Sequence, residues 1–518
     1  MPAAATATGR SSRDRQRVTG AGAQLRALLA LRWQMTRAPG VRLVLCLAGL
    51  AVLWLLALCL RSAGALEPAA LETAAALAPE AFLGFGVLAL VAPLTAGGGS
   101  EVVPAEQLAA FPVRPQAQFL GGLLLAPLNL VWVVQLLVLA VETSCLTLGG
   151  SLTAGVLTTA AYVAFATLLG QTVAWTVVGM RRTLAGRRAV IALAAALALG
   201  VLLVVRAGLG RAALEHAPTR LVVRAVVAGG AGDLLPWALV TGALGCGAAL
   251  ALLGGPRACG WALRRPGDAA VAAEGRTLRR RRPRASALRE LVALDRASVW
   301  RAPALRRGGL VLAVLPGLAA AGAQVPWSSL VVLPGLVAAG SGLLFGINAF
   351  ALDGSGALWL ASLPVEPTLV ARAKLLVLAE TVLAAVGLTA GAGALRAPAG
   401  PTAAELSAIL ASGLACTAVV VGTGLALSVR SPHRADLRGP RDAIAPPGAL
   451  ALASVRLSVP AAATGMLIAA AATSGRWWLP PVLALPVLGL AGLSLRRSLR
   501  RWADPVRRGR VVQVVARG

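Results

Sequence analysis

Residues 41–60 read VRLVLCLAGLAVLWLLALCL, an apolar run broken only by one arginine. Its apolar residues do not alternate with polar ones, as they would in a strand of a membrane β-barrel. A helix of about 20 residues crosses the roughly 30 Å of hydrocarbon in a bilayer. It also satisfies its backbone hydrogen bonds internally, which an open sheet in lipid cannot do. The segment therefore predicts a membrane-spanning helix.

Similar runs recur along the whole chain of 518 residues. Hydrophobic residues make up 58% of the sequence and charged residues only 13%, and the mean hydropathy is +0.78. A soluble domain usually carries about 25% charged residues. We therefore expect an all-α polytopic membrane protein with about 12 transmembrane helices. The expected spans are 41–60, 80–98, 118–142, 151–178, 189–207, 233–254, 308–323, 328–350, 371–392, 404–428, 451–473 and 480–495.

The basic residues lie mainly between the apolar runs and predict the orientation of the chain. Lys and Arg total 49, and all but Lys374 are arginine. With the N-terminus inside, 42 of them fall in cytoplasmic segments and 7 in external ones, as the positive-inside rule requires. The excess of Arg, Ala, Gly and Leu is typical of a GC-rich bacterial genome. We therefore expect a bacterial cytoplasmic membrane protein with both termini cytoplasmic, whose charges face the lipid bilayer and not nucleic acid.

Two segments of the chain have similar sequences. Residues 101–115 read EVVPAEQLAAFPVRP and residues 353–367 read DGSGALWLASLPVEP, at an offset of 252. The same offset places Gly170 on Gly422. A repeat of this length predicts one unit of six spans used twice. The two units would be parallel and related by a pseudo-twofold axis along the membrane normal.

This duplication divides the chain into five expected parts. They are a disordered cytoplasmic N-terminus (1–21), a first six-helix transmembrane unit with an N-terminal interfacial helix (22–254), a basic cytoplasmic linker (255–287), a second six-helix transmembrane unit (288–495) and a basic cytoplasmic tail (496–518). The interfacial helix is expected because residues 24–35, QLRALLALRWQM, place leucines over much of one helical face.

The sequence lacks the motifs of the common enzyme classes. A phosphate-binding loop of the form GxxxxGK[ST] needs a lysine, and the only lysine follows Ala373 inside an expected span. No GxSxG or HExxH motif is present, and the two histidines and six cysteines form no cluster with metal-ligand spacing. We therefore expect no catalytic, cofactor-binding or metal site.

One acid, Glu380, lies within an expected span, where a carboxylate is costly and often functional. We expect it either to line a transport pathway or to pair with Lys374 or Arg372.

Taken together, these features are similar to those of permease subunits of ATP-binding-cassette exporters, in the type-two export class common in actinobacteria. The similarity rests on an amphipathic helix before the first span, a six-span unit, the proline-centred loops FPVRP and LPVEP after the second span, and a longer external segment at 208–232. Two features depart from that class. Both units are fused in one chain, and only residues 474–479 stand where the second unit would have its external helices.

In that class the loop after the second span is a coupling helix that docks on a separate ATPase subunit. The resemblance thus implies that a partner ATPase, in two copies, binds the ATP and contacts residues 99–116 and 351–370. Prolines would stiffen these loops, and apolar side chains would enter a socket on the partner. The implied coupling residues are Glu101, Leu108, Phe111, Pro112 and Pro115 in the first loop, and Asp353, Leu360, Leu363, Pro364 and Pro367 in the second.

Other functions remain open at this point. The two loops could be ordinary turns into the next span, where proline is common. An ion-coupled secondary transporter with twelve spans would need functional acids within the membrane. A membrane-embedded enzyme would need acids or histidines clustered at one membrane face. A membrane scaffold without transport activity would need neither.

Overall fold

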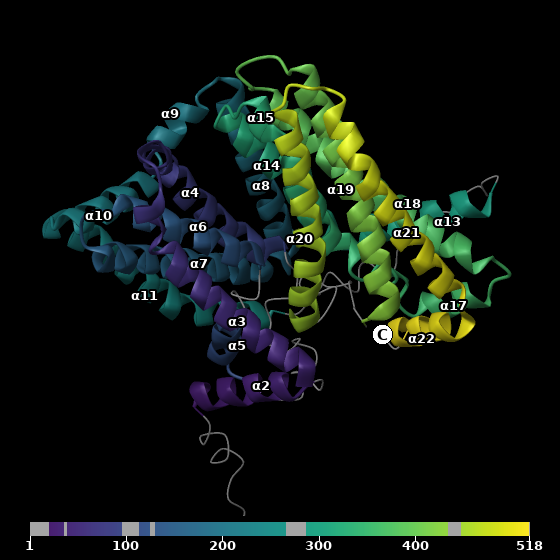
Figure 1. Ribbon diagram of the computed structural model, residues 1–518. Helices are drawn as coiled ribbons and strands as arrows, with labels where there is room; N and C mark the ends of the chain where they lie inside the picture. Colours follow the sequence, from purple (N-terminus) through teal and green to yellow (C-terminus); the bar gives the residue numbers. More distant parts are fainter. Residues whose placement is uncertain are drawn as a thin grey trace, which may run out of the picture.

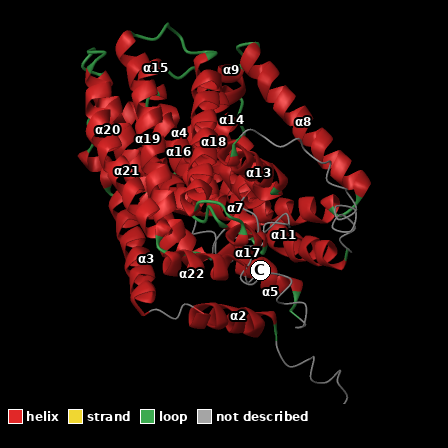
Figure 2. Cartoon of the chain, turned by 90° about the vertical axis from the view of Figure 1, so that its right-hand side faces the viewer, coloured by secondary structure: helices red, strands yellow, loops and turns green. Residues whose placement is uncertain are grey.

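The computed structural model describes residues 20–35, 39–95, 113–124, 130–265, 286–433 and 447–516. Within these ranges every regular element is a helix, as Figure 2 shows. Ten of the described helices are long and apolar enough to cross a membrane. The chain is therefore an all-α, multi-pass membrane protein, which confirms the expected fold class, whereas the count of about 12 spans stays a prediction.

The first half is built around the long helix α7, which packs against α4, α6, α10 and α11. Ser151 begins α7 by accepting a hydrogen bond from the backbone N–H of Ala154, which satisfies a group that a helix start leaves unpaired. Inside the half, the Tyr162 hydroxyl donates to the carbonyl of Phe82. The elements of this half are α2 (Ala21–Met35), α3 (Pro39–Cys59), the 3-10 turn η1 (Ser62–Ala65), α4 (Pro68–Thr95), α5 (Pro115–Leu124), α6 (Leu130–Leu146), α7 (Leu152–Arg181), α8 (Leu184–Arg206), α9 (Gly210–Glu215), α10 (Thr219–Ala231) and α11 (Leu234–Arg264).

The second half is built around α19, which packs against α16, α18, α20 and α21. Close approach depends on small residues, because a Cβ atom at Gly424 would lie only 3.0 Å from the carbonyl oxygen of Gly346. The Ser428 hydroxyl donates to that same oxygen across the contact, a pattern typical of helices packed in membranes. The elements are α13 (Ala287–Arg301), α14 (Pro303–Gly322), α15 (Trp327–Leu330), α16 (Leu333–Ser341), the π-helical turn η4 (Gly342–Gly346), the 3-10 turn η5 (Ala351–Asp353), α17 (Gly356–Ser362), α18 (Pro367–Ala394), α19 (Ala403–Arg430), α20 (Pro447–Ala472), α21 (Leu479–Ala503) and α22 (Pro505–Ala516).

Some expected span boundaries differ from those of the helices. The span expected at 118–142 lies on α5 and α6, and residues 125–129 between these helices lie outside the described part. The span expected at 328–350 corresponds to the candidate span Trp327–Gly346, which consists of α15, α16 and η4. A proline stands at the start of α16, where its fixed φ and missing N–H are tolerated. The expected helices of segment 208–232 are present as α9 and α10.

Two segments that were expected to be cytoplasmic, the linker and the tail, are partly helical. Helix α11 continues to Arg264 and α13 begins at Ala287, so the linker expected at 255–287 is helical at its start. Helix α21 continues to Ala503, and α22 follows it after one residue, so the expected tail at 496–518 is largely helical. The expected ends lie where the sequence stops being apolar, which is where a chain leaves the membrane. A helix can continue beyond that point until a residue interrupts its backbone hydrogen bonds.

The two halves meet along α14, which packs against α4, α8 and α9. Arg396 strengthens this boundary by donating to the backbone carbonyls of Val205 and Arg206 at the end of α8. In Figure 1, α19, α20 and α21 run steeply through the view, whereas α7 and α11 lie across it. The long helices of the halves thus do not share one direction. This arrangement does not display the expected pseudo-twofold axis along a membrane normal, which stays a prediction.

Candidate functional site

The segment between η4 and α18 combines a short exposed helix with a buried cluster of charges. Gly354 allows the turn from η5 into α17, because its φ of +49° is in the region that favours glycine. On α17 the side chains of Leu358 and Trp359 are 55% and 64% exposed. Leu360 and Leu363 are half-buried. The outward apolar surface of this segment therefore belongs mainly to Leu358 and Trp359.

Lys374, the only lysine of the chain, holds this segment at its base. Its Nζ atom lies 2.7 Å from Asp295 Oδ1 and 2.9 Å from Asp353 Oδ1. The three residues come from α18, α13 and η5, so one ammonium group joins three elements. Lys374 is buried, and two carboxylates face its single positive charge. Burial raises the pKa of Asp353, and the neighbouring Lys374 opposes that rise.

Aromatic side chains also hold the segment between η4 and α18 in place. The rings of Phe350 and Trp502 are stacked, with centroids 4.1 Å apart and planes 7° apart. The Trp502 indole N–H donates to the carbonyl of Pro367 at 2.7 Å, and Lys374 Nζ lies 5.9 Å from the centroid of Phe350. Helix α22 packs against α17 and η5. The segment is thus fixed from α13, α18, α21 and α22 at once.

No protein-family model, curated protein or solved structure matches this chain. In the described ranges, no group of three or more His, Cys, Asp and Glu side chains could hold a metal ion. What the segment offers is a rigid base and an exposed apolar contact surface.

The predicted coupling residues have different outcomes in the two loops. In the first loop Glu101, Leu108, Phe111 and Pro112 lie outside the described residues, and Pro115 is the first residue of α5. In the second loop Asp353 lies in the ion cluster, Leu360 lies on α17, Leu363 and Pro364 follow it, and Pro367 is the first residue of α18. Both loops therefore end at a proline that begins a helix, which is the position where proline is most favourable.

Glu380 does not pair with Lys374 or Arg372, the two partners that the sequence suggested. Its carboxylate receives two hydrogen bonds from Arg296 on α13, at 2.8 and 2.6 Å. The two side chains are 45% and 55% exposed. A role of Glu380 in a transport pathway stays a prediction.

Sequence reasoning missed Asp295, Trp502, Leu358 and Trp359. One signal was available for Asp295, because a lysine inside an apolar helix requires a buried acidic partner. No signal identified Trp359 as a contact residue, since a tryptophan near the end of an apolar run is equally typical of a membrane interface.

Proposed function

We propose that this chain is the membrane-spanning permease of an ATP-driven exporter, and that α17 is a coupling helix for a separate ATP-binding-cassette ATPase subunit. The observation that supports this most is the exposed pair Leu358 and Trp359 on a short helix whose base is fixed by Lys374. A tryptophan in a docking surface provides a large apolar contact at little conformational cost.

The rigid base matters because a coupling element must pass on motion without deforming. Asp353 lies directly before α17 and is paired with Lys374 on α18. Pro367, directly after the loop, begins the same helix and accepts a hydrogen bond from Trp502. A force on α17 would thus reach α18 from both sides of the loop.

The lack of a lysine suited to binding nucleotide phosphates also favours a partner subunit that supplies the energy of ATP. Phosphate-binding loops of the GxxxxGK[ST] type use a lysine to contact the nucleotide phosphates. The only lysine here is buried between two carboxylates. We therefore propose that ATP is bound by the partner and not by this chain, which has no catalytic role of its own.

The packing of the halves supports two six-span units, and hence two copies of the ATPase. The helix before the first span packs against the helix after the loop in both halves, as α2 on α5 and as α13 on α18. The central helix also packs against the last span in both, as α7 on α11 and as α19 on α21. The aligned glycines differ, since Gly170 approaches α4 and Gly422 approaches α21. The basic segments support cytoplasmic loops and termini in a bacterial membrane.

Site-specific cross-linking tests the proposed docking. A photoreactive benzoylphenylalanine replaces Trp359, and a control replaces Trp477, which is 62% exposed in the segment between α20 and α21. We expect a cross-link from position 359 to a protein that carries a phosphate-binding GxxxxGK[ST] motif, and none from position 477. Cross-links from both positions, or only to proteins without that motif, would contradict the proposal.

A pair of double variants then tests coupling in the complex with that ATPase. Leu358→Asp with Trp359→Asp should abolish substrate-stimulated ATP hydrolysis and weaken the complex, because charges replace the apolar contact. The control pair, Leu395→Asp with Trp477→Asp, changes equally exposed residues at the opposite end of the second-half helices. We expect it to keep coupling. A complex that remains coupled in both pairs contradicts the role of α17.

One observation favours the alternative of an ion-coupled secondary transporter. Glu142 on α6 is only 8% exposed. In the described part of the chain, one carboxylate oxygen of Glu142 and one of Glu80 on α4 are buried without a hydrogen-bond partner. Buried acids of this kind are typical of proton relays. Transport in proteoliposomes that needs a proton gradient, needs no ATPase and is lost in Glu142→Gln would establish this alternative.

A further inference from the structure

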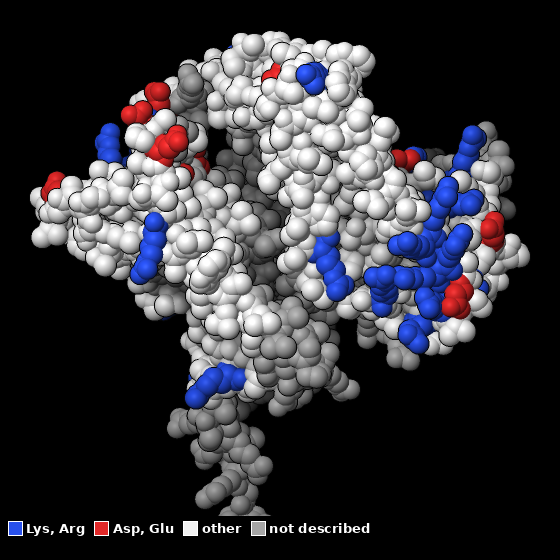
Figure 3. Space-filling view, viewed as in Figure 1, with Lys and Arg blue, Asp and Glu red and all other residues white. Residues whose placement is uncertain are grey.

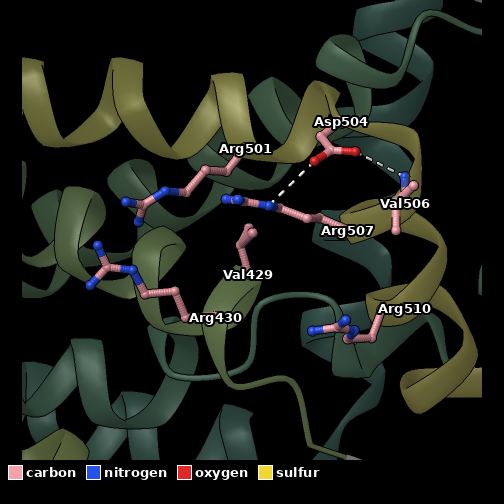
Figure 4. Close-up of a pocket in the computed structure, with 7 residues that line it drawn as sticks. All are labelled: Val429, Arg430, Arg501, Asp504, Val506, Arg507 and Arg510. Atoms are coloured by element: carbon pink, nitrogen blue, oxygen red, sulfur yellow. Dashed lines mark hydrogen bonds and ion pairs between the residues drawn. The ribbon is translucent and has the colours of Figure 1, made fainter.

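Four arginines from three elements surround one hollow at the end of α21, as Figure 4 shows. The hollow has a volume of about 420 Å³. Its lining consists of Val429, Arg430, Arg501, Asp504, Val506, Arg507 and Arg510. Arg430 is the last residue of α19, and Arg501 lies in the last turn of α21. Arg507 and Arg510 are three residues apart on α22, so they share one helical face.

The charges in this hollow are not balanced. Among the described residues that line it, Asp504 is the only acid, and it pairs with Arg507 at 3.3 Å. The same carboxylate accepts a hydrogen bond from the backbone N–H of Val506 and so caps the start of α22. In the parts of the chain that the structure describes, Arg430, Arg501 and Arg510 form no ion pair. Three guanidinium groups thus line the hollow without a counter-charge from the described residues.

The place of the hollow relates it to a bilayer. Helix α21 is one of the candidate membrane spans, and the hollow lies at its end, where α22 turns away from it (Figure 1). Residues 496–510 read RRSLRRWADPVRRGR, seven arginines with one acid. Figure 3 shows the resulting basic patch on the side of the molecule where α21 and α22 lie. Val506, which is 73% exposed, adds an apolar residue at the rim.

We propose that this hollow binds the phosphate group of an anionic lipid headgroup. Arginine forms paired, charge-assisted hydrogen bonds with phosphate oxygens. Basic side chains at the end of a membrane span are also attracted to anionic lipid. A lipid phosphate would lie at the depth where α21 leaves the apolar layer, and its glycerol and acyl groups would contact exposed Val506 and the apolar face of α21. Free inorganic phosphate has the same charged group but no such apolar part.

The site is independent of the proposed transport activity, because binding is measured on the purified chain alone. It does have a structural connection to the candidate coupling segment, since α22 carries two of the arginines and packs against α17. A bound lipid would neutralise the repulsion among the arginines and hold α22 in place.

The test titrates dioctanoyl phosphatidylglycerol into the full chain in a non-ionic detergent, with isothermal calorimetry and the Tm as readouts. The pocket variant combines Arg430→Gln, Arg501→Gln and Arg510→Gln. A matched control combines Arg496→Gln, Arg497→Gln and Arg500→Gln, three exposed arginines of α21 outside the hollow. Both variants lose three charges. We expect the pocket variant to bind at least about tenfold more weakly and the control to bind as the natural chain does.

A third variant guards against loss of folding as an explanation. Asp504→Asn removes the only acid among the described residues of the hollow, while its amide oxygen still caps α22. We expect it to bind phosphatidylglycerol roughly threefold more tightly, a gain that structural damage would not produce.

Three results would overturn the proposal. Equal weakening in the pocket variant and the control would mean that binding follows total charge and not this hollow. Equal binding of dioctanoyl phosphatidylcholine would exclude selection for an anionic headgroup. Saturable binding of inorganic phosphate at a similar affinity would assign the site to a free phosphate in place of a lipid.

Discussion

Two ion pairs join α13 to α18, and they begin at neighbouring residues of α13. Asp295 pairs with Lys374, and their side chains are 10% and 4% exposed. Arg296 pairs with Glu380, and their side chains are 55% and 45% exposed. Each pair joins one cation to one carboxylate between α13 and α18, and the pairs differ most in burial, since the first is enclosed by the protein and the second lies at its surface.

That difference should decide how much each pair contributes to the stability of the folded chain. An exposed ion pair adds little to stability, because each group gives up favourable contacts with water to form it and salt screens the remaining attraction. A buried pair contributes little against an apolar alternative, but the loss of one partner leaves a charge without compensation. The position of the second loop should therefore depend on Lys374 and hardly at all on Glu380.

The largest effect is expected for Lys374→Met. Methionine is similar in length but leaves Asp295 and Asp353 facing each other without a cation. We expect the free energy of unfolding to fall by about 3–5 kcal/mol, seen as a lower Tm in detergent and less folded protein. A variant with unchanged Tm would show that water already reaches the cluster.

A second variant sharpens this result by removing all charges of the cluster. Lys374→Met combined with Asp295→Asn and Asp353→Asn should recover most of the stability lost in Lys374→Met, since a neutral cluster leaves no buried charge. The measurement is the Tm of the triple variant beside that of the single one. A triple variant less stable than Lys374→Met would mean that the carboxylates have other essential partners.

The pH dependence offers a smaller effect with a definite sign. Burial raises the pKa of Asp353 from its ordinary value of 3.8, so the folded chain holds this proton at a higher pH than the unfolded chain. Stability from Asp353 therefore increases as the pH falls from neutral through the raised pKa toward the ordinary pKa of an aspartate. Asp353→Asn cannot titrate, whereas Asp295 and Lys374 remain in both proteins. We expect the Tm of the natural chain to rise relative to Asp353→Asn on acidification; a relative fall would mean a lowered pKa.

The smallest effect is expected at the exposed pair. Glu380→Gln should leave the Tm within ~2 °C of the natural chain, because Arg296 lies on α13, which is not one of the candidate spans, and its freed guanidinium can extend to water. Salt should weaken the pair in the natural chain and change little in the variant. If Glu380→Gln abolished transport without changing the Tm, the acid would have a pathway role that its pairing with Arg296 does not explain.

The same comparison indicates what the sequence could and could not predict. Spans were predictable because each depends on its own composition. The partner of Glu380 was predicted wrongly from nearness in sequence, although positions 372 and 374 are eight and six residues away and only residues three or four apart face each other on a helix. Asp295 lies 79 residues before Lys374, a distance over which no local pattern gives the pairing.

The candidate site was predicted less well than the fold for a related reason. The proline-centred motif predicted a coupling element before α18, but Leu360 and Leu363 were expected to face outward only because they align with Leu108 and Phe111 of the first loop. Helix α17 begins at Gly356, and its rotation places Leu358 and Trp359 outward. The face of a short helix is set by what packs behind it, here α22, and this contact joins segments that are far apart in sequence.

The packing of α22 behind α17 has a consequence for synthesis of the chain. Helix α17 ends at Ser362, and α22 begins at Pro505. At roughly 5–20 residues per second, a ribosome makes the second on the order of ten seconds after the first. Until then α17 lacks the support that orients Leu358 and Trp359, and Trp502 has not yet bonded to Pro367. A subunit that recognises the finished surface would therefore bind after translation has passed α22, which keeps assembly from starting on a half-made chain.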